Sequence, residues 1–300
     1  MLLVIALGGN ALLQRGEPLE SDLLRKNVKV AATVIAKAAE EHDIVIAHGN
    51  GPQVGLLALQ ADAYKKVHPY PLDILDAESQ GMIGYLLQQE IGNYLQSKSV
   101  ATLLTQVLVD AKDPAFQSPS KPIGPVYTES QAKAIQQAHD WILKPDGQYF
   151  RRVVPSPKPQ HIYELDAIKL LLQANTMVIA GGGGGIPCIK TGDKQLKGVE
   201  AVIDKDLTAS LLARQLKAES LVILTDVDAV YENWGTSAAK AIHNISSKTL
   251  RQYQFAAGSM GPKVEAACQF VDATLRPVMI GKLSDLNEIL KGKGGTLITH

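Results

Sequence analysis

Short apolar runs alternate along the chain with longer amphipathic stretches. Residues 2–7 contain no polar side chain and predict a strand buried on both faces. Across residues 21–41 apolar side chains recur every three or four positions, which predicts a helix. Residues 43–47 form the next apolar run. The three segments together predict a strand–helix–strand unit of a parallel sheet.

The same alternation continues to the C-terminus. It predicts helices at 73–97, 164–173 and 207–216, a helix opened by residues 258–263, and strands at 100–109, 177–180, 221–224, 277–280 and 296–299. Residues 191–193 resemble the turn of a hairpin. We therefore predict an α/β fold with an open, mostly parallel sheet of about eight strands.

Residues 110–159 differ in character because they contain eight prolines and the pair Asp146-Gly147, which is typical of a hairpin turn. We interpret this part as a small excursion from the main sheet that serves as a lid. A passive surface insertion is the alternative, although long loops of that kind are uncommon.

Composition limits the classes of function. The chain is 46% hydrophobic, and its 30 basic residues balance its 30 acidic residues, so a charge surplus for nucleic-acid binding is missing. No run approaches the ~18 apolar residues of a membrane span. Cys188 and Cys268 show no metal or disulfide spacing. We expect a cytoplasmic protein with a small-molecule substrate, no nucleic-acid partner and no membrane partner.

Glycine-rich turns follow three of the predicted strands, at residues 8–9, 49–51 and 181–185. Without a Cβ atom, the backbone amides of such a turn can approach an anion closely. One such turn would be weak evidence, because glycine is also used for geometry alone. Three of them at strand ends favour a phosphate-binding crevice. Neither a P-loop nor a Gly-x-Gly-x-x-Gly turn opening a helix is present.

Three lysines stand in constrained contexts. Lys205 lies between Asp204 and Asp206 directly before a predicted helix, Lys121 lies between two prolines, and Lys263 begins a helix after a glycine-containing turn. A solvated surface position is the ordinary interpretation of any lysine. Phosphoryl transfer, however, requires several fixed cations around spreading negative charge. We therefore interpret the three lysines as parts of one phosphoryl-transfer site.

Five further side chains allow two interpretations each. His48 could act as a base, but a hydrogen bond to the backbone is favoured. Tyr231 and Trp234 could stack on a purine base or pack within their loop. Asp226 and Asp228 could face a metal–nucleotide, but a role in capping the turn is favoured.

Seven motifs, in order along essentially the whole chain, closely resemble those of carbamate kinases in the amino acid kinase superfamily. They are ALGGNA (6–11), HGNGPQVG (48–55), KPIGP (121–125), VVPSP (153–157), GGGGIP (182–187), VIDKD (202–206) and SMGPK (259–263). The resemblance implies a three-layer αβα sandwich and a homodimer. It implies the reaction ATP + carbamate ⇌ ADP + carbamoyl phosphate with Mg²⁺, usually running toward ATP with carbamoyl groups from arginine or purine breakdown.

The resemblance also implies a single domain, with a carbamate-binding lobe (1–200) that includes the lid (111–159) and a nucleotide-binding lobe (201–300). The catalytic residues implied are Lys121, Lys205, Asp206 and Lys263. The substrate-binding residues implied are Gly8, Gly9, Asn10, Gly49, Asn50 and Gly51. The nucleotide-binding residues implied are Gly182, Gly183, Asp204, Thr225, Asp226, Val227, Tyr231, Met260 and Lys263. No residue is assigned as a metal ligand.

In this scheme Lys121 closes over the substrate, Lys205 bridges the transferred phosphoryl group, Asp206 orients the lysines and Lys263 holds ATP phosphates. Residues 191–196 and Glu78 depart from the family's pattern. Two alternatives stay open: a relative that phosphorylates another small carboxylate, and a catalytically silent nucleotide sensor.

Overall fold

An eight-stranded sheet forms the centre of the computed structural model, which describes the chain except residues 14–16, 65, 67, 140, 193–194 and 257–258 and the side chains of Asn10 and Ala11. The strand order is β15 (Asn244–Ser246), β17 (Thr296–Thr299), β16 (Val278–Lys282), β12 (Ser220–Thr225), β1 (Leu2–Leu7), β2 (Asp43–His48), β9 (Thr176–Ile179) and β3 (Ser99–Thr102). Each neighbouring pair is parallel except β16–β17. The predicted open, mostly parallel sheet is confirmed.

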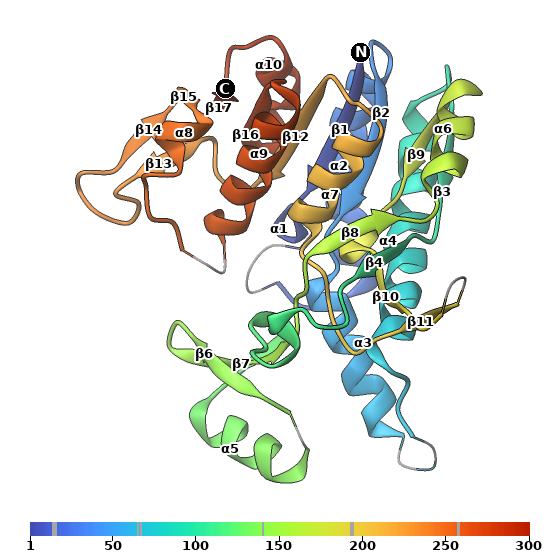
Figure 1. The fold of residues 1–300 in the computed structure, drawn as a ribbon, viewed down its shortest axis with the longest axis vertical. Coiled ribbons are helices and arrows are strands. Elements are labelled where there is room, and N and C mark those ends of the chain that lie inside the picture. The colour runs from blue at the N-terminus through green and yellow to red at the C-terminus, as the bar shows by residue number, and fades with distance from the viewer. Residues whose placement is uncertain (14–16, 65, 67, 140, 193–194, 257–258) are drawn as a thin grey trace.

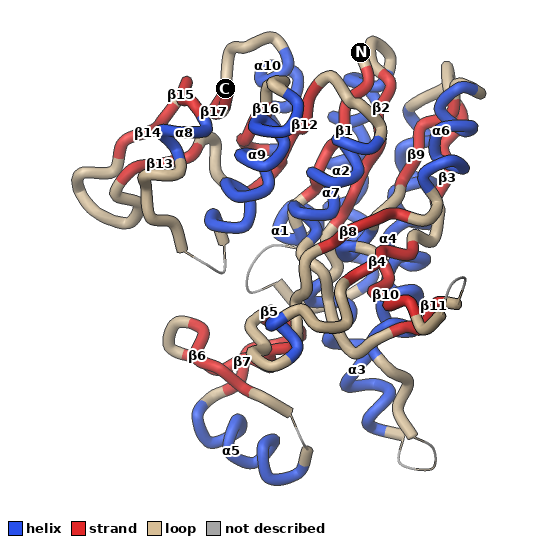
Figure 2. Tube along the Cα trace, in the orientation of Figure 1, coloured by secondary structure: helices blue, strands red, loops and turns tan. Residues whose placement is uncertain are grey.

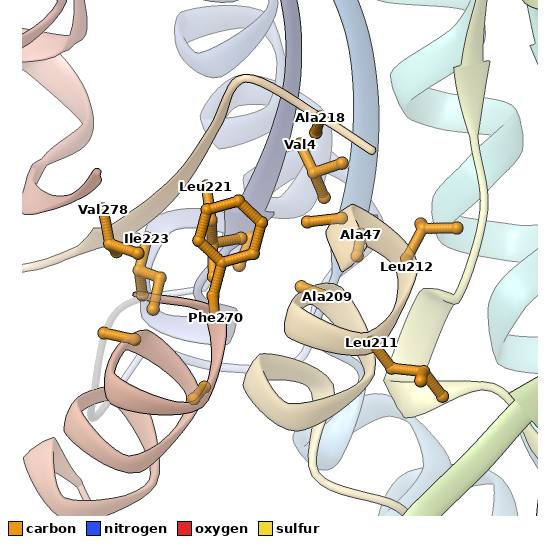
Figure 3. Close-up of a cluster of buried hydrophobic side chains, with 14 of the residues drawn as sticks. Val4, Ala47, Ala209, Leu211, Leu212, Ala218, Leu221, Ile223, Phe270 and Val278 are labelled. Carbon is orange, nitrogen blue, oxygen red and sulfur yellow. The ribbon is translucent and has the colours of Figure 1, made fainter. Parts of the chain in front are cut away.

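Helices cover both faces of this sheet (Figures 1 and 2). On one face lie α2 (Ser21–Ala39), α4 (Leu72–Tyr94) and α10 (Leu286–Leu290); on the other lie α6 (Leu165–Gln173), α7 (Lys205–Gln215) and α9 (Met260–Thr274). Along β1, Leu3 and Ile5 pack toward α2 and α4, whereas Val4 packs toward α7 and α9. This two-sided burial explains why β1 contains no polar residue. Figure 3 shows Phe270 of α9 packed over the sheet beside Leu221 and Ile223.

The predicted strand at 100–109 is wrong, because two strands of different sheets occupy it. β3 belongs to the main sheet, whereas β4 (Gln106–Val109) belongs to a four-stranded sheet of order β11 (Leu196–Gly198), β10 (Ile186–Lys190), β4, β8 (Pro159–Ile162). Between them Thr105 is fully buried, its N–H donates to Gln80 Oε1 and its Oγ1 accepts from Gly181 N–H. These bonds fix the point where the chain leaves the main sheet.

The hairpin predicted around residues 191–193 is confirmed by the antiparallel pairing of β10 with β11. Asp193 itself lies outside the described residues. A smaller two-stranded sheet, β13 (Val230–Glu232) with β14 (Lys240–Ile242), and the short helices α1 (Gly9–Leu12) and α8 (Ser247–Leu250) complete the body, together with the turns η2 (Gly182–Gly184) and η3 (Leu283–Asp285).

The lid segment (residues 111–159) forms a unit of its own beyond the main sheet, at the bottom of Figure 1. It contains η1 (Pro114–Phe116), α5 (Glu129–Ala138) and a three-stranded antiparallel sheet of β5 (Lys121–Tyr127), β7 (Tyr149–Val154) and β6 (Leu143–Asp146). The predicted hairpin turn is confirmed, since Asp146 pairs with Tyr149 and Gly147 has φ +64°.

Helix α3 (Gly51–Ala63), which was not predicted from the sequence, connects the lid segment to the body. A Cβ atom at Gly55 would lie 2.0 Å from the Cα of Gly124, so α3 and β5 meet backbone to backbone. Beside this contact Val54, Ile123 and Val202 share a small apolar cluster. Because Lys121 is two residues from Ile123 and Asp204 is two residues from Val202, the cluster brings the lid lysine to the start of α7.

Candidate functional site

Two of the three predicted glycine turns lie side by side at the carboxyl ends of β1 and β2. Gly8 N–H donates to Leu224 O, and Gly49 N–H donates to Leu7 O. A Cβ atom at Gly49 would lie 3.0 Å from Gly9 N and 3.4 Å from Cδ of Lys205. The glycines therefore allow two turns and the stem of Lys205 to converge. Asn10 follows in α1, and its side chain lies outside what the structure describes.

The third glycine turn is buried against the protein. Gly181, Gly183, Gly184 and Gly185 all have positive φ, between 67° and 101°. A Cβ atom at Gly184 would lie 2.1 Å from Ile203 O, and Thr208 Oγ1 donates to Gly184 O at 2.7 Å. This run therefore supports the first turn of α7, which begins at Lys205.

Two glycines of the same run contact the end of β2. A Cβ atom at Gly182 would lie 2.3 Å from Nε2 of His48, and one at Gly183 would lie 2.2 Å from Nδ2 of Asn50. Their assignment to the nucleotide stays a prediction.

Asp204 caps α7 and holds the lid lysine. Its Oδ1 accepts from the N–H groups of Asp206 (2.9 Å) and Leu207 (3.3 Å), while its Oδ2 accepts from Lys121 Nζ at 2.5 Å. Burial alone would raise the pKa of Asp204, but the charges of Lys121 and Lys205 outweigh burial and hold this pKa below its ordinary value. Asp204 is therefore an anion that joins the lid segment to the helix N-terminus.

Asp206 bridges the other two lysines. Its Oδ1 lies 2.5 Å from Lys205 Nζ and its Oδ2 lies 3.3 Å from Lys263 Nζ. Burial lowers the pKa of Lys205, and Lys263 adds to this effect, whereas Asp206 and Asp204 oppose it. For Lys263 burial acts in the same direction, but Asp206 and Asp204 prevail and raise its pKa.

The predicted convergence of Lys121, Lys205 and Lys263 is confirmed by these contacts, which come from the lid segment, α7 and α9. Three ammonium groups share two carboxylates, so the cluster has one positive charge in excess. The N-terminus of α7 adds partial positive charge at the same point. Such an arrangement can stabilise an anion that carries more than one negative charge.

The loop after β12 lies close enough to this cluster to act on it. The charge of Asp226 contributes to raising the pKa of Lys263, and Thr225 Oγ1 donates to Asp226 Oδ1 at 3.0 Å. Val227 follows in the same loop, and Met260 begins α9 next to Lys263 in the chain. The nucleotide roles of these residues stay predictions.

Tyr231 and Trp234 lie together with their rings edge to face, 5.1 Å between centroids. The Tyr231 hydroxyl donates to Asp228 Oδ1 at 2.9 Å, and the capping role of Asp228 stays a prediction. Trp234 is 66% exposed. Its ring is thus available to stack on a planar group.

His48 hydrogen-bonds the backbone, as favoured from the sequence. Its Nδ1 lies 3.1 Å from Gly49 O, and burial lowers its pKa to about 4. The ring is therefore neutral near pH 7 and donates from Nδ1.

Two residues of α4 that contact the site, Asp76 and Ser79, were not predicted from the sequence. Asp76 Oδ1 and Ser79 Oγ both accept from Asn50 Nδ2, at 3.0 and 2.8 Å. A signal was available, because Asp76 occupies the same helix face as Leu72 and Ile83. A carboxylate within an apolar helix face requires a partner.

No three His, Cys, Asp or Glu side chains stand close enough to hold a metal ion, within the part of the chain that the structure describes. The described helices include none with the length and apolar character to cross a membrane.

Three comparisons connect this geometry to known proteins. Residues 1–282 match the amino acid kinase family. A carbamate kinase of Rhizobium meliloti is 53% identical over 302 residues, which cover 100% of this chain and 93% of that protein. The structure of carbamate kinase from Giardia lamblia bound to citric acid superposes with a TM-score of 0.94 at 44% identity, and that of the same enzyme bound to AMP-PNP with 0.89 at 44% identity. Each pairing covers 99% of this chain and 98% of the other.

Proposed function

The chain belongs to the amino acid kinase family, and from this premise we propose that it acts as a carbamate kinase. The reaction is the reversible transfer of a phosphoryl group between ATP and carbamate. The observation that carries the proposal is the convergence of Lys121, Lys205 and Lys263 on the Asp204 and Asp206 carboxylates, beside two glycine turns.

Toward ATP, an oxygen of the ADP β-phosphate attacks the phosphorus of carbamoyl phosphate. The bond from phosphorus to the carbamate oxygen breaks, and carbamate leaves with the electron pair. Negative charge spreads over the three equatorial oxygens, and Lys205 neutralises it from the start of α7. Lys121 covers the carbamoyl side and Lys263 the nucleotide side, while Asp206 holds Lys205 and Lys263 apart and in place.

The two substrates approach from different lobes. Carbamoyl phosphate lies against the turns at residues 8–10 and 49–51, in the lobe of residues 1–200. Because the N–H groups of Gly8 and Gly49 donate to Leu224 O and Leu7 O, the donors to the substrate are the other N–H groups of these turns. The nucleotide lies on residues 201–300, with its base beside the loop that follows Thr225. The relative bound to AMP-PNP supports the binding of a nucleotide.

The acidic side chains present fit a magnesium ion that comes with the nucleotide. Mg²⁺ is usually held by phosphate oxygens, waters and one or two carboxylates, and Asp226 and Asp206 stand near Lys263. When bound, Mg²⁺ neutralises charge on the nucleotide phosphates.

We also propose a homodimer through β3 and the outer face of α4. β3 is an edge strand of the main sheet, which leaves backbone groups open for pairing. On α4 a Cβ atom at Gly81 or Gly92 would meet nothing within 4 Å, and Tyr85 is 52% exposed between them. This open, partly apolar face suits a second copy of the chain.

We propose a cytoplasmic location. The two cysteines are buried and unpaired, which agrees with it.

The test is whether the purified protein forms ATP from ADP and carbamoyl phosphate. A coupled assay measures the rate of ATP formation. Lys205→Ala should lower kcat about 10²–10³-fold, as removal of one transition-state donor does. Lys169→Ala is the control, because Lys169 is half-exposed and pairs with Asp166 on α6. ATP binding without turnover by the wild type would contradict the proposal and indicate a nucleotide sensor. Wild-type rates in Lys205→Ala would contradict the role of that lysine.

A further inference from the structure

Asp76 is a buried carboxyl group whose hydrogen-bond partner is a side chain at the substrate end of the site. It is 1% exposed, and its Oδ1 accepts from Asn50 Nδ2 at 3.0 Å. Its Oδ2 is fully buried and has no hydrogen-bond partner among the described residues. A buried polar atom left without a partner destabilises the folded state. A purely structural position on this apolar helix face would be better served by an aliphatic residue.

The surroundings of Asp76 favour its neutral form. Burial raises its pKa well above the usual range, the hydrogen bond from Asn50 opposes this, and the negative charges of Asp73 and Glu200 add to it. Asp73 lies on the same helix and Glu200 on the segment before α7. Among the described residues, the groups that shift the pKa of Asp76 include no cation. A neutral carboxyl group with its proton on Oδ2 still offers Oδ1 as an acceptor.

Ser79 fixes which end of the Asn50 amide faces α4. The Ser79 hydroxyl donates its proton to Asp76 O at 2.9 Å, so its oxygen can only accept. The group 2.8 Å from that oxygen must therefore be the Asn50 NH₂ and not its carbonyl oxygen. Both N–H bonds of the Asn50 side-chain amide therefore donate, one to Asp76 Oδ1 and one to Ser79 Oγ.

The remaining polar atom of this side chain is Asn50 Oδ1, which accepts no hydrogen bond from any residue that the structure describes. Asn50 follows Gly49, whose backbone lies beside Gly9 and the stem of Lys205. Gly183 packs on the amide, where a Cβ atom would approach Nδ2 to 2.2 Å. The amide is thus held from two sides, with one acceptor uncommitted.

We propose that Asp76 and Ser79 are positioning residues, which hold Asn50 so that it offers the substrate an oxygen and no N–H. The inference rests on the proposed function. A fixed acceptor selects an acyl phosphate that carries an N–H donor, as the amino group of carbamoyl phosphate does. Acetyl phosphate has a methyl group at that place and leaves Asn50 Oδ1 unpaired, which a hydrogen-bonding site penalises strongly.

The experiment compares ATP formation from carbamoyl phosphate and from acetyl phosphate in the wild type, Asp76→Ala, Asp76→Asn and Glu78→Ala. In Asp76→Ala the amide of Asn50 is free to turn. The value of kcat/KM for carbamoyl phosphate should fall about tenfold, mainly through KM, as for one lost hydrogen bond. The kcat/KM for acetyl phosphate and the KM for ADP should stay within about twofold of the wild-type values.

Asp76→Asn should restore the preference for carbamoyl phosphate, because its side-chain oxygen can accept from Asn50 as before. Glu78→Ala is the matched control, since Glu78 is an exposed carboxylate on the same helix. If Asp76→Ala does not fold, as judged by its circular dichroism and melting curve, Ser79→Ala carries the test with a smaller loss in the same direction.

An equal loss with both phosphate donors, or a raised KM for ADP, would show that Asp76 is merely structural and overturn the inference. If the wild type is active and Asp76→Ala or Ser79→Ala keeps its preference for carbamoyl phosphate over acetyl phosphate, the inference is overturned and the proposed function is not. A wild type that forms no ATP from carbamoyl phosphate would overturn the proposed function as well.

Discussion

At the scale of single residues, the site depends on Asp206, one carboxylate shared by two ammonium groups. Lys205 Nζ and Lys263 Nζ each contact a different oxygen of Asp206. A neutral side chain there would leave two buried cations next to each other with less compensation. Asp206 is therefore the residue on which the protonation of both lysines depends.

We predict that Asp206→Asn lowers kcat/KM about 10²-fold and moves the alkaline limb of its pH profile to lower pH. Burial and Lys263 already lower the pKa of Lys205, and Asp206 opposes them. Without this opposing charge, Lys205 loses its proton at a lower pH. The measurement is kcat/KM for carbamoyl phosphate against pH, which reports groups of the free enzyme.

Asp228→Asn provides the control for this profile, because Asp228 bonds the Tyr231 hydroxyl within its own loop. Its alkaline limb should coincide with that of the wild type. If the alkaline limb of Asp206→Asn lies at the same pH as that of the wild type, the limb does not report the deprotonation of Lys205.

A second prediction at this scale concerns the stability of the fold. The pKa of Asp76 is raised above its ordinary value of 3.8, so the folded state binds more protons than the unfolded state between these two values. The wild type's free energy of unfolding therefore falls as pH rises through this window. Asp76→Asn removes the titrating group and should gain stability relative to the wild type as pH rises from 4 to 8.

Urea denaturation of both proteins across that range measures the effect. The difference in the free energy of unfolding should be smallest at pH 4 and grow with pH. A constant difference would mean that Asp76 is ionised in the folded protein at every pH tested.

At the scale of elements, the backbone contact between α3 and β5 decides where Lys121 lies. We predict that Gly55→Ala separates the lid segment from α3, because its Cβ atom would lie 2.0 Å from Gly124 Cα. A displacement of about 1 Å at a catalytic group can cost roughly 10²-fold in rate. The measurement is kcat for ATP formation, together with protease cleavage of the lid segment.

Gly294→Ala is the matched control, because its Cβ atom would meet Ile289 at an ordinary 3.6 Å. It should keep the wild-type rate and cleavage pattern. If Gly55→Ala keeps both as well, the contact does not set the position of the lid lysine.

The elements also show what the sequence could and could not predict. The buried strand at residues 2–7 and the helix at 21–41 followed from periodicity, because tertiary contacts there reinforce the local pattern. The apolar run at 100–109 misled, because two strands in different sheets leave the same pattern as one long strand. The bonds of Thr105 that divide the run come from residues 80 and 181, which no local pattern reveals.

The same limit applies within the site. Lys121, Lys205 and Lys263 could be singled out because prolines, aspartates and a glycine turn mark them locally. Asp76 could not be connected to Asn50, since that pair depends on how α4 packs against the end of β2. Partners of known site residues that lie on other elements need the fold before they can be named.

At the scale of the whole molecule, the site joins parts that are distant in the sequence, and one face of the protein is left open. Lys121 belongs to the lid segment, Lys205 to the middle of the chain and Lys263 to α9, so the active arrangement requires every layer in place. The face made by β3 and α4 takes no part in this arrangement. The proposed second copy of the chain would cover its exposed Tyr85 and the open space at Gly92.

We predict that Tyr85→Glu converts the proposed dimer to a monomer. In an isologous interface the substitution places two like charges in one apolar patch, which costs several kcal/mol and weakens association at least 100-fold. Sedimentation equilibrium measures the mass, which should fall to that of one 32.2 kDa chain. Leu170→Glu is the control, because Leu170 is 66% exposed on α6, across the sheet from α4. A monomeric wild type, or a Tyr85→Glu variant that keeps the wild-type mass, would place any subunit contact elsewhere.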